Sequence, residues 1–203
     1  MLATGFIESG YDSRDYQYNT DLTTEGLPTS YDYSNYINIP IKDQGNTSTC
    51  VPHSLSTVIE TMMFKDNPNK LDIHEIYDKR AEKIDGMTIR EAFRIIKKDG
   101  YNTKSGRVFL PEHSSYFRLN SEIQLKWSLV ANGPCVLALP VRSEDINFWR
   151  GGKDMGGHAI ACIGYDEDGF ILQNSWGSNW GNYGRCHLPY SDLRYVIEAW
   201  GMD

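Results

Sequence analysis

The chain has 203 residues, of which 40% are hydrophobic, four cysteines and a formal net charge of −7. This length and composition suffice for one large domain or two small lobes with a buried core. Acidic and basic residues are interleaved without a dense basic patch, which excludes nucleic acid as the main partner. No run approaches a membrane span and no signal peptide is present, so we expect no membrane partner and a cytoplasmic location; a virion, or secretion by another route, stays open.

Residues 1–26 are polar and show neither helical nor strand periodicity, which predicts an N-terminal extension ahead of the folded domain. We expect ordered structure to start near Leu27-Pro28. Two roles stay open for the extension. It braces the second half of the protein, or it lies across a cleft as a short plug.

The first predicted helix begins at Cys50 and runs to about Asp66. Beyond Pro52, apolar residues recur at intervals of three and four, which is typical of a helix with a buried face. Proline in the first turn loses no helical hydrogen bond, because the amides there have no intrahelical partner. Cys50 is therefore predicted at the positive end of the helix dipole, where a thiolate is favoured.

Three further helices are predicted before the strands begin. One spans Leu71–Ile84, and the next opens at a capping box in which Thr88 and Glu91 satisfy each other's amides. The third spans Ser121–Asn132 and is expected to bury Trp127. The first half of the protein should therefore be mainly helical.

The second half is predicted to consist of short strands bounded by Gly, Asp and Pro residues. These strands span Cys135–Val141, Gly157–Tyr165, Gly169–Asn174 and Tyr183–Leu188. Three of the cysteines, Cys135, Cys162 and Cys186, lie in them and are expected to be buried free thiols. A helical lobe followed by a β lobe leaves a cleft between the two.

A nucleophilic thiolate needs a base, a group that orients the base, and donors for an oxyanion. His158 begins one predicted strand and Asn174 ends the next. Their side chains can therefore meet where the ends of these two neighbouring strands lie side by side. Gln44 lies in the loop before the Cys50 helix, where its side-chain amide can converge with the Cys50 N–H. Trp176 can place an indole over the hydrogen bond between the histidine and the asparagine, where it excludes water.

Three short motifs resemble, in their order and roles, those of the papain-like cysteine peptidases, the family of papain and the cathepsins. They are Gln44-Gly45 followed after four residues by Cys50, then Gly157-His158-Ala159, then Asn174-Ser175-Trp176-Gly177-x-x-Trp180-Gly181. The resemblance implies an α+β fold in which residues 27–203 form a two-lobe peptidase domain. A mainly helical lobe would cover about 36–110 and a β-barrel-like lobe about 111–198, with the active-site cleft between them.

The resemblance also implies an activity, that of a thiol hydrolase that cleaves peptide bonds in a polypeptide substrate without a cofactor or metal. The implied catalytic residues are Cys50, His158 and Asn174, with Gln44 in the oxyanion hole, and the implied substrate-binding residues are Gly86, Met87, Gly157 and Trp176. The protein is expected to be a monomer, or a part of a larger assembly.

Several features depart from the usual family pattern. The short spacing between the motifs and the lack of a long pro-region suggest a compact bacterial- or viral-type member. Thr47 stands where the family has a disulfide cysteine, and Ser48, Thr49 and Val51 also differ from the pattern. Two alternatives therefore stay open: an inactive peptide-binding or structural module of the same fold, and a transamidase that uses the same thioester intermediate.

Two rival uses of the cysteine are also considered. His53, one helical turn beyond Cys50, is a rival base. A zinc site would use Cys50, His53, His158 and Cys162. Against zinc, residues four apart on a strand lie about 13 Å from each other, which is too far for ligands of one tetrahedral ion.

Overall fold

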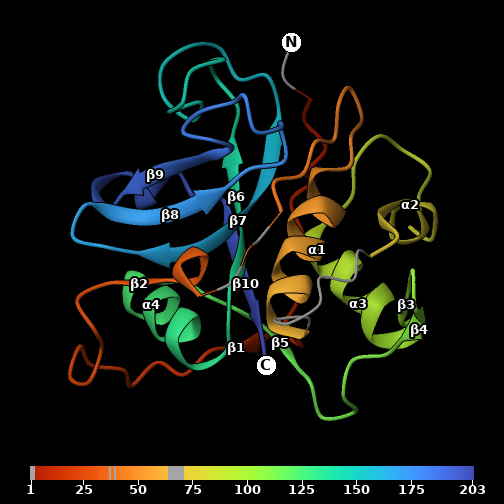
Figure 1. The fold of residues 1–203 in the computed structure, drawn as a ribbon, viewed down its shortest axis with the longest axis horizontal. Coiled ribbons are helices and arrows are strands. Elements are labelled where there is room, and N and C mark those ends of the chain that lie inside the picture. Colours follow the sequence, from red (N-terminus) through yellow and green to blue (C-terminus); the bar gives the residue numbers. More distant parts are fainter. Residues whose placement is uncertain (1–2, 37, 39, 64–70) are drawn as a thin grey trace.

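A computed structural model describes residues 3–36, 38, 40–63 and 71–203. A central helix, α1 (Cys50–Met63), stands between a twisted sheet and two shorter helices, α2 (Ile73–Asp78) and α3 (Ile89–Asp99) (Figure 1). No helix in these ranges is both long enough and apolar enough to cross a membrane. The molecule therefore has a helical half and a sheet half that meet along α1.

The main sheet has eight strands in the order β1-β5-β10-β6-β7-β8-β9, with β2 paired to β7. The strands are β1 (Tyr16–Gln17), β2 (Tyr31–Asp32), β5 (Tyr116–Arg118), β6 (Cys135–Pro140), β7 (Gly157–Tyr165), β8 (Gly169–Gln173), β9 (Arg185–Pro189) and β10 (Glu198–Met202). Strands β3 (Tyr101–Thr103) and β4 (Gly106–Val108) form a separate hairpin. Within the described ranges the sheet does not close on itself, so the expected barrel-like lobe is an open sheet.

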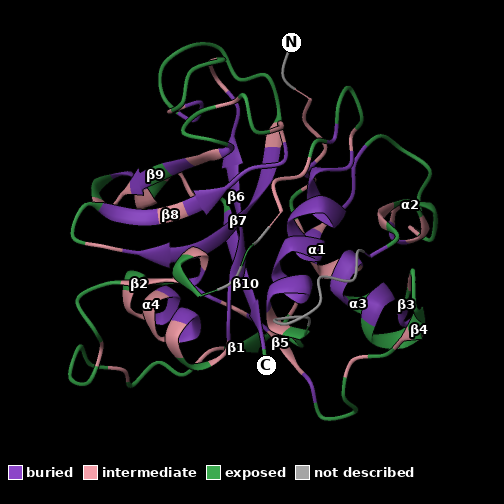
Figure 2. Ribbon diagram, in the orientation of Figure 1, coloured by how far each residue is buried: buried purple, intermediate pink, exposed green. Residues whose placement is uncertain are grey.

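Helix α1 is buried along nearly its whole length, because both halves of the molecule pack on it (Figure 2). Its polar residues are satisfied locally: the Ser54 hydroxyl donates to the Cys50 carbonyl (2.9 Å) and the Thr61 hydroxyl to the Thr57 carbonyl (2.7 Å). The buried Glu60 carboxylate pairs with the Lys42 ammonium (2.5 Å). The helix can therefore be buried on all sides without leaving these polar groups unpaired. The predicted end at residue 66 lies outside the described residues.

Helix α2 is shorter than the predicted helix over Leu71–Ile84. Asp72 caps it as expected, by accepting from the Glu75 N–H (3.1 Å), but the helix ends at Asp78. The Glu91 carboxylate accepts from the Ala81 N–H (2.6 Å), which holds the following segment as a loop against α3. The predicted capping box therefore forms in part. The Thr88 hydroxyl accepts from the Glu91 N–H (3.0 Å), as expected, but the Glu91 carboxylate does not reach back to the Thr88 N–H.

Helix α4 (Glu122–Ala131) buries a different face from the expected one. Its buried residues are Gln124, Leu125, Ser128 and Leu129. Trp127 is only half-buried and donates its indole N–H to the Thr23 carbonyl of the N-terminal extension (2.7 Å). The prediction failed because the extension covers the Trp127 side of the helix while the sheet covers the other side.

Strand β10 is a central strand that the sequence pattern did not reveal. It pairs with β5 on one side and β6 on the other, and all five of its residues are buried. Its sequence contains a glutamate and a glycine, which interrupt the apolar pattern of a buried strand. Gly201 is required by close approach, since a Cβ there would lie 2.5 Å from the Phe117 ring.

The N-terminal extension is ordered against the body of the protein, so the expected start of order near Leu27 is wrong. Tyr16 and Gln17 form β1, which pairs in parallel with β5, and Tyr18 stacks on Phe117 at 4.7 Å between ring centroids. Figure 1 shows the extension running from the N-terminus, along the junction of the two halves, to β1. We call residues 3–26 the arm.

Candidate active site

Cys50 is the first residue of α1 and has no exposed surface. The loop before it is pinned to the sheet half, because the Gln44 N–H donates to the Ser175 carbonyl (2.8 Å). Burial raises the pKa of the Cys50 thiol to about 12, and the N–H groups of Ala159 and Val51 offset this only in part. The effect of burial on the thiol pKa is thus larger than the effect of the helix dipole, and the expected thiolate is not favoured in this structure.

His158 and Asn174 meet as their strand positions predicted. The imidazole Nε2 of His158, on β7, donates to Asn174 Oδ1, just after β8, at 2.7 Å. The same oxygen accepts from the Ser175 N–H (2.7 Å), which fixes the amide. Nδ1 of His158 is buried and has no hydrogen-bond partner among the described residues. The asparagine therefore selects the tautomer that leaves Nδ1 free to take a proton.

Aromatic rings enclose the imidazole. Trp176 stacks on His158 with ring centroids 4.2 Å apart, as predicted for an indole that shields the asparagine bond. Phe148 meets the same imidazole edge-on at 5.6 Å, and Trp180 packs edge-on against Trp176 at 5.2 Å. The sequence analysis missed Phe148, because it lies in a loop without periodicity. These rings exclude water from the hydrogen bond between His158 and Asn174.

Burial also sets the protonation state of the pair. It lowers the pKa of His158 to about 4, and the hydrogen bond to Asn174 opposes this shift only in part. With the pKa of Cys50 raised to about 12, both groups are neutral over the whole physiological range in this structure. The site therefore holds a neutral thiol and a neutral imidazole rather than an ion pair.

The lowered pKa of His158 predicts a loss of stability in acid. Between pH 6.5 and 4 the unfolded chain binds a proton at this residue and the folded chain does not. The free energy of unfolding should therefore fall as the pH falls, by up to about 3 kcal/mol at this one site. Urea unfolding of wild type and His158→Gln across this pH range measures it: the wild-type curve should fall more steeply, and parallel curves would contradict the prediction.

The Gln44 side chain is held from both ends. Its Oε1 accepts from the Ser175 hydroxyl (2.7 Å) and its Nε2 donates one hydrogen to the Thr47 carbonyl (2.8 Å). The second amide hydrogen remains for another acceptor. Ser175 was not singled out from the sequence, although it adjoins Asn174 in the matched motif. The role of Gln44 in an oxyanion hole stays a prediction.

All four predicted substrate-binding residues contact the arm. The Met87 N–H donates to the Gly5 carbonyl (3.0 Å), and the Gly157 carbonyl accepts from the Gly5 and Phe6 N–H groups (both 3.1 Å). The Trp176 indole donates to the Ala3 carbonyl (3.2 Å). Gly86 also lies against the arm, since a Cβ on it would be 2.6 Å from the Gly5 carbonyl oxygen. The structure thus brings these residues together around a peptide segment.

The rival base, His53, bonds to the backbone just before the start of its own helix. Its Nδ1 donates to the Thr49 carbonyl (2.8 Å), and burial lowers its pKa. Cys162, the fourth ligand of the zinc alternative, lies opposite Cys135 between β6 and β7, in a different core cluster from Cys50. In the described ranges, no three His, Cys, Asp or Glu side chains are grouped as metal ligands. All four cysteines are free and buried, so the expectation for the three strand cysteines is confirmed.

Comparisons with known proteins agree with this geometry. The family model "Papain family cysteine protease" matches residues 97–192, which contain His158 and Asn174. Cathepsin 7 of Mus musculus is 24% identical over 196 residues, which cover 77% of this chain and 59% of the relative. Procathepsin L of Felis catus is 26% identical over 196 residues, which cover 76% of this chain and 58% of the relative. The chain thus spans less than two thirds of both relatives.

Among solved structures, Xylellain, a cysteine protease from Xylella fastidiosa, has the same fold. Its TM-score is 0.82 at 20% identity, and the match covers 99% of this chain and 96% of that chain. In this chain the central helix starts at a thiol, and a histidine and an asparagine meet on the sheet that packs against this helix. In sequence and in fold, this chain is therefore similar to the papain-like cysteine peptidases.

Proposed function

We propose that the chain hydrolyses peptide bonds with Cys50 as nucleophile, His158 as base and Asn174 as the group that orients the base. One observation carries the proposal. His158 has its Nε2 held by Asn174 at 2.7 Å and its Nδ1 unpartnered, while the N–H of the next residue, Ala159, lies against the Cys50 sulfur. An oriented imidazole with an unpartnered nitrogen, next in the chain to the residue that contacts the sulfur, supports proton transfer from the thiol to His158.

In the proposed mechanism, His158 Nδ1 takes the thiol proton and the Cys50 sulfur bonds to the carbonyl carbon of the scissile peptide. The Gln44 amide and the Cys50 N–H stabilise the oxyanion, and one such donor contributes about 3 kcal/mol to the transition state. His158 then returns the proton to the leaving amine, which gives a thioester on Cys50. Water, deprotonated by His158, hydrolyses the thioester and restores the thiol.

The loop at Thr47, Ser48 and Thr49 is the main argument for an inactive module, because it departs from the family pattern. In the structure this loop is well supported. The Thr47 hydroxyl donates to the Gln44 carbonyl (2.7 Å) and lies 2.5 Å from the Thr49 hydroxyl. These bonds fix the segment between the oxyanion donor and the nucleophile where the family has a disulfide cysteine. This supports an enzyme over an inactive module.

Selective alkylation tests the proposed function. The full-length protein is treated with a thiol-directed epoxide at neutral pH, and mass spectrometry follows all four cysteines. All four thiols are buried, so each reacts only through opening, and the other three serve as internal controls. An activated Cys50 should react at least about tenfold faster than Cys186, since only a thiolate is a strong nucleophile. Equal rates at all four cysteines would refute the activated pair.

A further inference from the structure

Two buried cysteines face each other across neighbouring strands of the main sheet. Cys135, the first residue of β6, lies directly opposite Cys162 of β7 in the antiparallel register. Neither side chain has exposed surface, and both belong to the same core cluster. Residues directly opposite each other in an antiparallel pair place their side chains on the same face of the sheet. The two thiols therefore point into this core together.

The spacing of the two positions fits a disulfide. The Cα atoms of directly opposite residues lie about 4.5–5.5 Å apart, and disulfides span Cα separations of about 4.4–6.8 Å. The two side chains also interact: a hydrogen bond with the Cys162 thiol, together with burial, raises the pKa of the Cys135 thiol. A bond between the two sulfurs can thus form while the strands keep their register.

Oxidation of the pair would disrupt little else in the core. The Cys162 thiol donates one weak hydrogen bond to the Gly164 carbonyl, with the sulfur 3.7 Å from the oxygen. A thiol is a weak donor, so the loss of this bond is a small cost. Because the sulfurs already lie in the same buried layer, no polar group has to be moved out of water to form the disulfide.

The other two cysteines are placed differently. Cys186 of β9 lies opposite Leu172, and Cys50 starts α1 in the other core cluster. Among the four cysteines, all of which lie in the described ranges, Cys135 and Cys162 are the one pair set opposite each other in the sheet. The register therefore selects one disulfide pairing.

A link between these residues would close a loop over residues 135–162. This loop contains the rest of β6, the connection that carries Phe148, and the part of β7 that carries His158. The Phe148 ring packs edge-on against the His158 imidazole at 5.6 Å between centroids. A cross-link restricts the unfolded chain more than the folded one, since the two strands are already paired. The disulfide would therefore stabilise the segment that carries the candidate base.

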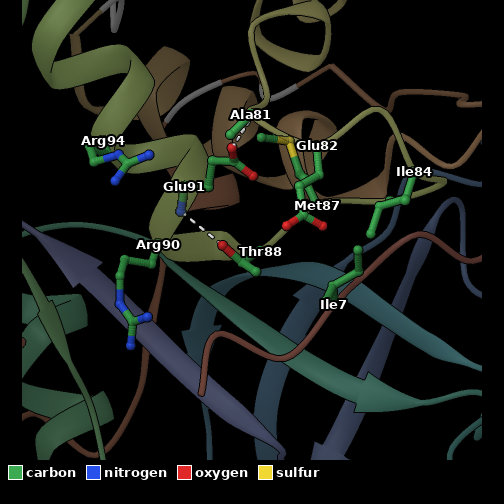
Figure 3. Close-up of a pocket in the computed structure, with 10 residues that line it drawn as sticks. Ile7, Ala81, Glu82, Ile84, Met87, Thr88, Arg90, Glu91 and Arg94 are labelled. Atoms are coloured by element: carbon green, nitrogen blue, oxygen red, sulfur yellow. Dashed lines mark hydrogen bonds between the residues drawn. The ribbon is translucent and has the colours of Figure 1, made fainter. Parts of the chain in front are cut away.

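The facing cysteines lie apart from the candidate nucleophile. Cys50 packs with Ala159 and Ala161 in the cluster on the α1 side of the sheet, whereas the cysteine pair belongs to the cluster on the other side. A pocket of about 290 Å³ is lined by residues of the helical half, among them Ile84 and Met87 (Figure 3). Oxidation of the pair would therefore leave both this pocket and the Cys50 thiol in place.

We propose that Cys135 and Cys162 are a redox-active dithiol site, which a low-molecular-weight disulfide such as oxidised glutathione converts into a cross-strand disulfide that stabilises the sheet half. The thiolate of one cysteine displaces one thiol from the reagent and forms a mixed disulfide, and the second cysteine displaces the other thiol. The two protein thiols lose two electrons and two protons, one S–S bond forms, and the S–S bond of the reagent is reduced to two thiols.

Burial determines when this reaction takes place. Both thiols are shielded in the paired sheet, so the exchange occurs while the two strands are pairing or when they open transiently. After the sheet closes, the same burial shields the disulfide from thiol reductants. The proposal does not depend on peptidase activity.

The reduced full-length protein is incubated with oxidised glutathione, with and without a subdenaturing concentration of urea that allows the sheet to open. A matched sample is kept in reduced glutathione. Free thiols are then blocked with iodoacetamide, peptides are mapped by mass spectrometry without reduction, and the melting temperature is measured. Cys135→Ala and Cys162→Ala remove one partner each. Cys186→Ala is the matched control, because Cys186 is a buried thiol of the same core cluster without a facing cysteine.

We expect wild type and Cys186→Ala to yield peptides joined through Cys135 and Cys162. Their melting temperatures should rise on oxidation by about 5 °C or more, and those of Cys135→Ala and Cys162→Ala should not. Each variant is compared with its own reduced form, so a loss of packing does not affect the result. Cys50 is present throughout, so its modification would change all melting temperatures alike.

Three results would overturn the proposal. If no joined peptide forms with or without urea, the two cysteines only pack together. If the joined peptide forms and the melting temperature does not rise, the link does not stabilise the sheet half. If Cys135 or Cys162 is joined to Cys50 or Cys186 as often as to its opposite residue, the register does not select the pairing.

Discussion

Replacement of Cys50 by alanine is expected to lower kcat for peptide hydrolysis on the order of 10⁵- to 10⁶-fold, because no other group can form the thioester. Cleavage of a fluorophore-labelled unfolded protein measures this loss, and the melting temperature confirms folding. Hydrolysis that survives the substitution would exclude a thiol mechanism.

The matched control for this variant is Cys186→Ala. Cys186 is also buried and free, but it lies on β9, in the core cluster on the other side of the sheet from Cys50. Its truncation removes one buried sulfur and should lower the free energy of unfolding by about 1 kcal/mol without changing kcat. Equal losses of activity in the two variants would show that packing, not nucleophilicity, is measured.

Where a local motif contains the candidate residues, the sequence was sufficient to predict their positions in the fold. Cys50 begins α1 because Pro52 fits a first helical turn, and the structure has the helix start at that residue. His158 and Asn174 lie at one strand start and just after the neighbouring strand's end, and antiparallel pairing of β7 with β8 brings them together. Both inferences need only strand and helix ends, which short-range patterns mark well.

The path of the arm was not predictable, because its contacts are mostly main-chain bonds and single side chains without a period. Phe6 and Tyr18 pack into the body, and neither belongs to a repeating pattern. Strand β10 was not predicted for a related reason, since Glu198 is polar in the sequence but is buried through its bonds to Ser9 and Arg118. Such residues are polar in the sequence and become interior only through partners far along the chain.

The protonation state of Cys50 was also not predictable from local sequence. The helix start favours a thiolate at Cys50, and this local effect contributes at most about 2 kcal/mol. Complete burial raises the pKa of the thiol to about 12, which is a larger effect in the opposite direction. Burial depends on the whole fold, including the arm, whose Gly5 lies against the Ser48 backbone.

His158→Gln is expected to lower kcat on the order of 10⁴-fold or more, whereas His53→Gln should change it by less than about threefold. The two histidines are the rival bases, and both are buried near the start of α1. His158 has a free Nδ1 and an oriented Nε2, whereas the Nδ1 of His53 is bonded to the Thr49 carbonyl at 2.8 Å. Glutamine can replace that single bond of His53, but it cannot accept a proton from Cys50.

The rate of Cys50 alkylation separates a lost base from a distorted site. His158→Gln should abolish the fast reaction of Cys50 at neutral pH, whereas His53→Gln should keep it. A general distortion of the fold would instead lower the melting temperature and expose Cys135, Cys162 and Cys186 to the reagent. If His53→Gln removes the neutral-pH reaction and His158→Gln retains it, the base is the histidine one turn along the helix, and the bond to Asn174 is structural.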